Sequence, residues 1–145
     1  MILLESGLNY KILIAGKHLP DRFEQLQNWK DKQVIYLGFV DDIDRYTLAA
    51  DVLLNTVTSG GGIKTKVVEA LGMSTTVIST RSGAAGIDKN ICGDKLLLVE
   101  DHRWDLFAAH VISTMKAEET KTPHSFYAQF SWTGIIKRAV ASLSV

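Results

Sequence analysis

Short apolar runs recur along the chain and are separated by longer segments with a different spacing. Each run has three to five residues, mostly leucine and β-branched side chains. A short apolar run that ends at glycine or at a polar residue is typical of a strand buried on both faces of a sheet. We therefore predict strands over residues 11–15, 34–37, 52–54, 75–79 and 96–99.

The segments between these runs carry apolar residues three or four positions apart, which is the spacing of one face of a helix. In one of them, Phe23, Leu26 and Trp29 follow one another at intervals of three. Asp41 or Asp42 is well placed to cap the next predicted helix. We predict helices over 21–30, 42–50, 63–71 and 104–115, a polar connection over 117–125, and one or two helices over 130–143.

Strands that alternate with helices of about ten residues indicate βαβ units and a mostly parallel sheet. The chain has 145 residues, of which 46% are hydrophobic and 22% charged, and this is the size and composition of one globular domain. We expect a single α/β domain over residues 1–145 with a Rossmann-like, doubly wound parallel sheet. Ligands of such sheets bind beyond the carboxyl ends of the strands, so functional residues are expected there.

The charge balance and the cysteine content exclude several classes of protein. Sixteen lysines and arginines balance sixteen aspartates and glutamates, which argues against a nucleic-acid-binding protein. Cys92 is the only cysteine, so neither an internal disulfide nor a cysteine zinc cluster can form. No apolar run approaches the roughly 18 residues of a membrane-spanning helix. The start of the chain lacks the basic segment of a secretory signal, and we expect a cytoplasmic protein.

The segment around Gly60, Gly61 and Gly62 carries the most chemical information. Consecutive glycines let backbone amides approach a ligand closely, and a predicted helix begins just after them. The first amides of a helix have no acceptor within the helix, and the helix dipole adds positive charge at that end. Lys64 and Lys66 are unusual there, because this end of a helix favours acidic residues. A bound anion, such as a phosphate or a diphosphate, would explain both lysines.

Glu69 follows one helical turn after Thr65 and lies roughly 6–9 Å along the axis from the first free amides. This is about the separation between the phosphates and the ribose hydroxyls of a nucleotide, and a carboxylate accepts hydrogen bonds from two neighbouring hydroxyls. An ion pair with Lys66 on a solvated helix face is an equally good interpretation of Glu69.

Two better-known phosphate-binding motifs do not fit this segment. A Walker A loop requires glycine directly before Lys-Thr, and Ile63 stands there. A dinucleotide-binding fingerprint that starts at Gly60 would have Thr65 where glycine or alanine is needed. A P-loop NTPase and an NAD-dependent dehydrogenase are therefore disfavoured.

Several segments taken together resemble one known family. They are AGK at 15–17, YLGFVDD at 36–42, AADVLLN at 49–55, GGIKTKVVEAL at 61–71, TVIST at 76–80 and GAAGI at 83–87. This order resembles the C-terminal, donor-binding domain of GT-B glycosyltransferases of the "glycosyl transferases group 1" type. The resemblance implies a hexosyltransferase-like enzyme that uses a nucleotide-diphosphate sugar, retains the anomeric configuration and requires no metal or other cofactor. It also implies a role in bacterial polysaccharide or glycoconjugate synthesis.

The resemblance further implies roles for individual residues. Glu69 would bind the ribose hydroxyls, and Gly38, Phe39 and Val40 would lie against the nucleobase. The residues that would hold the diphosphate are Gly61, Gly62, Ile63, Lys64, Thr65 and Lys66. Four residues after strand ends are further candidates to line the donor site, namely Gly16, Lys17, Thr80 and Arg81. No residue is assigned a catalytic role, and the scattered histidines indicate no metal site.

The sequence departs from the family pattern in two ways. Many members have a second glutamate eight positions before the ribose glutamate, where this chain has Gly61, so recognition of the sugar must come from elsewhere. Members also have an N-terminal acceptor-binding domain and an additional first strand, and neither has a counterpart here. The chain alone is therefore expected to be inactive. Because that strand is central, we expect the remaining strands to close the gap or self-association to fill it.

Other functions stay open at this stage. One is a nucleotide-binding module without transfer activity, and another is a GT-B-like sugar epimerase, which would need acid and base residues that the sequence does not reveal. A phosphoacceptor receiver domain is a weaker alternative, since Asp41 and Asp42 follow a strand but the next strand ends in Asn55.

Overall fold

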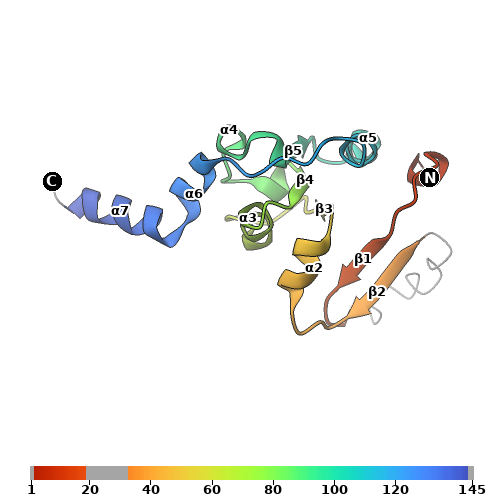
Figure 1. Ribbon diagram of the computed structural model, residues 1–145, viewed down its shortest axis with the longest axis horizontal. Helices are drawn as coiled ribbons and strands as arrows, with labels where there is room; N and C mark the ends of the chain where they lie inside the picture. The colour runs from red at the N-terminus through yellow and green to blue at the C-terminus, as the bar shows by residue number, and fades with distance from the viewer. Residues whose placement is uncertain (1, 19–32, 144–145) are drawn as a thin grey trace. The chain divides into compact units, whose positions relative to one another are not determined.

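The computed structural model describes residues 2–18 and 33–143 (Figure 1). The helix predicted over residues 21–30 lies outside the described residues. The chain divides into two compact units, Met1–Tyr46 and Thr47–Val145.

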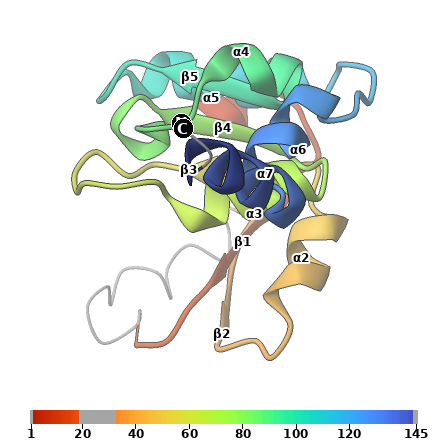
Figure 2. The ribbon, with the colours of Figure 1, turned by 90° about the vertical axis from the view of Figure 1, so that its left-hand side faces the viewer.

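The first unit contains a short helix and a two-stranded parallel sheet. Helix α1 (Ile2–Glu5) precedes strand β1 (Ile12–Ala15), which pairs in parallel with β2 (Val34–Gly38). The two strands run side by side in both views (Figures 1 and 2). Both confirm predicted strands, and their continuous apolar runs are typical of parallel pairing.

Helix α2 (Ile43–Ala49) follows this sheet and continues into the second unit. The Asp42 carboxylate accepts a hydrogen bond from the Arg45 amide at 3.1 Å, so Asp42 is the cap, one of the two predicted candidates.

The second unit is built on a three-stranded parallel sheet with the order β3–β4–β5. Its strands are β3 (Val52–Asn55), β4 (Thr76–Thr80) and β5 (Leu96–Val99). The bounds of all three were predicted to within one residue. Val52 pairs with Thr76, and Val77 pairs with Leu96, so the carboxyl ends of the strands lie along one edge.

Helices cover both faces of this sheet. Successive side chains of β4 point to opposite faces, so neighbouring residues of this strand belong to different cores. Val77 belongs to a core formed with α3 (Thr65–Gly72), α4 (Lys89–Cys92) and α6 (His124–Phe130). Ile78 belongs to a second core formed with α5 (Trp104–Thr114). The protein thus has the α/β fold with parallel sheets that the sequence predicted.

Two features differ from the sequence-based expectation. The segment between β4 and β5 contains short helical turns that periodicity did not predict, namely η2 (Ser82–Ala84), α4, and η3 (Gly93–Lys95). The sheet is also not one continuous ladder: β1 has β2 as its strand neighbour, and β3 has β4, within the residues that are described. Within the range 130–143, where one or two helices were predicted, the structure has α7 (Trp132–Leu143). Helix α6 begins at His124, inside the predicted polar connection, and was not predicted.

Candidate functional site

The loop between β3 and α3 depends on glycine at two of its three glycine positions. Gly60 has a φ of +93° and Gly62 has a φ of +80°, in the left-handed region that side chains with a Cβ rarely adopt. Gly61 has no positive φ, and a Cβ at this position would meet no other atom within 4 Å. The backbone turn therefore requires Gly60 and Gly62, while Gly61 leaves open space above the loop.

Helix α3 begins at Thr65, two residues later than predicted, and its start carries no cap. Lys64 occupies the N-cap position with an extended backbone and no side-chain cap hydrogen bond, and the first turn holds no acidic residue. The Val67 amide donates to the Lys64 carbonyl at 2.9 Å. In the described part of the chain, the amides of Thr65 and Lys66 form no hydrogen bond. Two donors and the positive end of the helix dipole are thus available to an anion.

The two lysines at this helix start differ in their surroundings. The Lys64 ammonium folds back over the loop and donates to the carbonyls of Gly60 at 3.1 Å and Gly61 at 3.4 Å. Lys66 is exposed and forms no ion pair with any described residue. One cation therefore closes the loop onto the helix start, and the other faces solvent.

Glu69 lies one turn further along α3, and its side chain is exposed. Its carboxylate makes no ion pair and no hydrogen bond among the residues described. The ion pair with Lys66 that the spacing also allowed is therefore not formed. A carboxylate that is free of protein partners can accept hydrogen bonds from hydroxyl groups of a ligand.

A buried polar cluster lies below the loop, at the carboxyl ends of β3 and β4. The Asn55 amide donates to the Ser79 hydroxyl and to the Gly83 carbonyl, both at 2.9 Å. The Gly83 amide donates to the Thr80 hydroxyl at 3.1 Å, and the Thr80 hydroxyl donates to the Val57 carbonyl. The sequence did not predict this cluster, because three of its four hydrogen bonds join residues that are 23 to 28 positions apart.

Thr80 and Arg81 were expected as possible lining residues of the site, and both have partners within the protein. Thr80 is fully buried. Arg81 is exposed, forms an ion pair with Glu100, and donates its backbone amide to the Val99 carbonyl at 2.9 Å. These contacts hold the turn after β4 in place.

Asp101 fixes the next residue of this turn. Its carboxylate accepts hydrogen bonds from the hydroxyl and the amide of Ser82, the latter at 3.1 Å. Both hydrogen bonds favour the charged carboxylate, and the bond from the hydroxyl has the larger effect. The pKa of the Asp101 carboxyl therefore lies below its usual value. The turn that follows β4 is therefore anchored to the segment that follows β5.

The residues expected around a nucleobase lie in the first unit. Gly38 has a φ of +70° and ends β2 where its register with β1 shifts, since Ile14 pairs with Tyr36 and the next residue pairs with Gly38. Phe39 follows with 61% of its surface exposed. The Lys17 ammonium lies 4.3 Å from the centre of the Phe39 ring, a cation–π contact.

Gly16 completes this group of residues. The Gly16 carbonyl accepts a hydrogen bond from the Tyr36 hydroxyl at 2.5 Å, and the Gly16 amide donates to the Gly38 carbonyl at 2.9 Å. The structure thus brings Gly16, Lys17, Gly38 and Phe39 together in one unit, as it brings the glycine loop and α3 together in the other. Val40 directly follows Phe39 and is half-buried.

A cavity of about 590 Å³ opens at the opposite end of β3, β4 and β5, and the sequence did not predict it. The C-terminal ends of α2, α3 and α5 border it, so their dipoles direct negative partial charge into it. Lys95 lines this cavity, is only 3% exposed and donates to the Thr76 hydroxyl at 3.3 Å.

Neither a metal-binding cluster nor a membrane-spanning helix is present among the described residues. No three histidine, cysteine, aspartate or glutamate side chains gather where they could hold a metal ion. No described helix combines the length and the apolar character that a membrane crossing requires.

Comparison with known proteins adds the family. The family described as "Glycosyl transferases group 1" matches residues 2–117. No curated protein sequence matches the chain.

Several solved structures share the fold at low sequence identity. HepE from Anabaena, solved with UDP-glucose, superposes with a TM-score of 0.70 at 20% identity over 99% of this chain and 44% of HepE. A glycosyltransferase from Rickettsia africae gives a TM-score of 0.74 at 18% identity, over 97% of this chain and 42% of that protein. The galactosyltransferase WaaB of the lipopolysaccharide outer core gives 0.70 at 14% identity, over 97% and 43%. The chain thus spans less than half of each of these proteins.

Proposed function

Because the chain belongs to the group 1 glycosyl transferases, we propose that it is the donor-binding part of an enzyme that uses a nucleotide-diphosphate sugar. The uncapped start of α3 carries this proposal: two free amides, Lys66 and the helix dipole offer positive charge, and Glu69 offers a free carboxylate one turn away. HepE, which has the same fold, was solved with UDP-glucose, and this agrees with a sugar nucleotide as the ligand.

In this proposal the diphosphate lies against residues 61–66, and Glu69 accepts hydrogen bonds from the ribose hydroxyls. Residues 38–40 lie against the nucleobase, where the exposed ring of Phe39 offers a stacking surface. When the sugar leaves, charge develops on the diphosphate, and the helix start with its lysines stabilises that charge. Cationic and dipolar stabilisation of this kind supports transfer without a required metal, and we propose retention of configuration and a role in polysaccharide or glycoconjugate synthesis.

Transfer itself requires an acceptor, and we propose that an N-terminal acceptor-binding domain supplies its site in a full-length enzyme. The chain alone then binds nucleotide without transferring sugar. The outer edges of β1 and β3, each with one strand neighbour in the described structure, favour self-association of the isolated chain. A sedimentation mass equal to that of the monomer at every concentration would contradict self-association.

The experiment is a titration of the ¹⁵N-labelled chain with UDP, GDP and ADP, followed by amide NMR. We expect one nucleotide to shift the amides of residues 60–66 and 38–40. Glu69→Gln removes the charge and keeps the shape, and should weaken binding about tenfold, the scale of one hydrogen bond to a charged group. Glu118→Gln changes an exposed glutamate in the connection after α5 and is the matched control.

Absence of shifts with all three nucleotides at millimolar concentration would contradict the proposal. Shifts confined to other residues, or equal effects of the two glutamine variants, would also contradict it.

A further inference from the structure

Thr80 links the two loops that follow adjacent strands. Its side chain is fully buried at the carboxyl end of β4. The hydroxyl donates to the Val57 carbonyl, in the loop between β3 and α3, and accepts from the Gly83 amide at 3.1 Å, in the turn after β4. Since a hydroxyl has a single donor, its orientation is fixed by Val57.

The surroundings leave this arrangement little freedom. A Cβ on Gly83 would lie 2.5 Å from the Asn55 amide nitrogen and 2.7 Å from the Thr80 hydroxyl oxygen. The Asn55 amide donates to the Gly83 carbonyl, so both backbone polar groups of Gly83 are bound within the cluster. The turn after β4 therefore sits directly on the strand ends and holds the Thr80 hydroxyl in one position.

The same turn contacts the glycine loop at a second point, close to the start of α3. A Cβ on Gly86 would lie 2.9 Å from Cγ1 of Ile63, and Ile63 precedes the N-cap residue of α3. The loop between β3 and α3 is thus held by Thr80 near its beginning, at Val57, and by Gly86 near its end.

We propose that Thr80 is a positioning residue of the nucleotide site, which fixes the glycine loop through Val57 and does not touch the ligand. The proposal rests on the function proposed above. A buried hydroxyl cannot line an open site, but it can set where the loop places the free amides of Thr65 and Lys66. Binding groups that are held in place before the ligand arrives cost less ordering on binding, so loss of this anchor should weaken affinity.

Thr80→Val tests the proposal, because valine keeps nearly the same shape and removes the hydroxyl. We expect Thr80→Val to weaken binding of the nucleotide about tenfold, and Thr80→Ser, which restores the hydroxyl, to bind within about twofold of the original chain. Thr75→Val removes another buried hydroxyl, which donates to the Thr47 carbonyl at 2.9 Å just before β4, and should leave the affinity unchanged. If Thr80→Val does not fold, Thr80→Ala provides the same test, because the smaller side chain leaves space for a water molecule beside the Val57 carbonyl and the Gly83 amide.

The amide spectrum without ligand separates positioning from simple stabilisation. In Thr80→Val, shifts should concentrate in residues 57–64 and 83–86. Unchanged affinity in Thr80→Val, together with weakened binding in Glu69→Gln, would overturn the positioning role and leave the proposed function intact. If the original chain binds no nucleotide, both proposals are overturned. If Thr80→Val and Thr80→Ser both bind the nucleotide more weakly than the original chain, the role of the hydroxyl would also be overturned.

Discussion

Helices α3 and α7 have equally clear apolar faces but opposite surroundings. In α3 the face formed by Val67, Ala70 and Leu71 is fully buried against the sheet. In α7 no residue is buried: Trp132 is 80% exposed and Leu143 is 84% exposed. Figure 1 shows α7 extending beyond α6, away from β3, β4 and β5. A helical period therefore predicts a helix and its apolar face, but not what covers that face.

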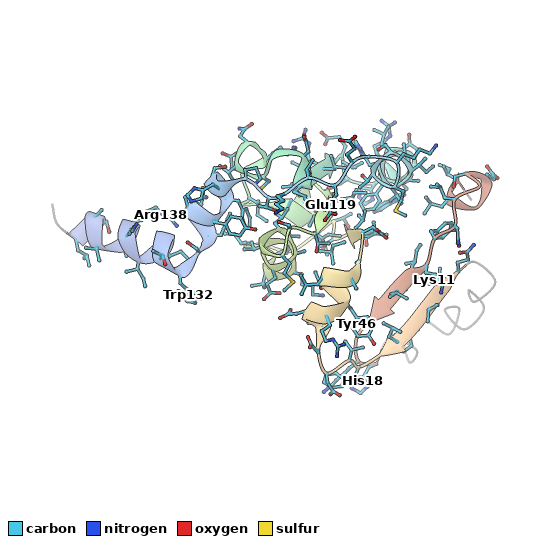
Figure 3. The ribbon with its side chains drawn as sticks, viewed as in Figure 1. Lys11, His18, Tyr46, Glu119, Trp132 and Arg138 are labelled. Carbon is cyan, nitrogen blue, oxygen red and sulfur yellow. The ribbon has the colours of Figure 1, made fainter. Side chains whose placement is uncertain are left out.

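The position of α7 is nevertheless defined by its contacts with α6. The Arg138 guanidinium donates to the Ala128 carbonyl at 2.8 Å and to the Gln129 carbonyl at 2.5 Å. Gly134 packs so closely that a Cβ there would lie 2.0 Å from the Ala128 carbonyl oxygen. Figure 3 labels Trp132 and Arg138 on this helix. The polar side of α7 holds it to α6, and none of its apolar side chains is buried by the residues that the structure describes.

The largest effect is expected from truncating the same residue type in the two helices. Leu71→Ala should lower the free energy of unfolding by about 2–5 kcal/mol, because it removes buried contacts and leaves a cavity. Leu143→Ala should change it by less than about 0.5 kcal/mol, since that side chain is exposed. Chemical denaturation of both variants measures the difference. Equal losses would mean that α7 is covered in solution.

A smaller effect is expected at the turn that leads into α3. Gly62→Ala places a Cβ at a φ of +80° and should cost about 1–2 kcal/mol of unfolding free energy. Gly61→Ala is the matched control, because Gly61 has open space and no positive φ, and its change should stay below about 0.5 kcal/mol. Equal stability of the two variants would show that the turn does not impose a left-handed residue at Gly62.

Much of the fold follows from the sequence because its strands coincide with short, continuous apolar runs, even in β1 and β2, where Leu13 and Ile35 are exposed. A buried parallel strand needs a continuous apolar run, and each of the five runs became a strand. The turns between β4 and β5 could not be predicted in this way, because they are too short to show a period. Helix α4, for example, has four residues and depends on the Asp88 carboxylate, which accepts from the Asn90 amide at 2.9 Å.

The candidate site was predictable only where its residues are close in sequence. The glycine loop, the lysines and Glu69 lie within one segment, so spacing alone places them around one helix start. The cluster of Asn55, Thr80 and Gly83 is different, since its hydrogen bonds join residues on different strands and turns. Periodicity contains no information on such pairs. From its place after a strand, Thr80 was expected to line the site, whereas the structure buries its side chain.

A still smaller effect is expected on the exposed face of α7. Ile136 is 58% exposed, so Ile136→Ala should change the free energy of unfolding by less than about 0.5 kcal/mol at every protein concentration. Denaturation at two concentrations, a hundredfold apart, measures this. An effect of the substitution that grows with concentration would show that a second copy covers this face, and the contrast with α3 would then hold only for the monomer.

The smallest effect concerns the charges at two helix starts. Helix α3 has no acidic residue in its first turn, whereas α5 has Asp105. The pKa of the Asp105 carboxyl is lowered to about 2, mainly by hydrogen bonds from the Arg103 guanidinium at 2.7 and 2.9 Å. Since the carboxyl has a lower pKa in the folded state, its contribution to stability is complete above its unfolded pKa of about 4 and is lost as the pH falls toward 2. Arg103→Gln should therefore raise the pKa of Asp105 and leave stability at pH 7 almost unchanged, because the pair is exposed. Carboxyl ¹³C chemical shifts between pH 1.5 and 6 measure this pKa, and an unchanged value would mean that the amides of the helix start, not Arg103, stabilise the charge. In that case the bare start of α3 would attract an anion more strongly than its lysines alone imply.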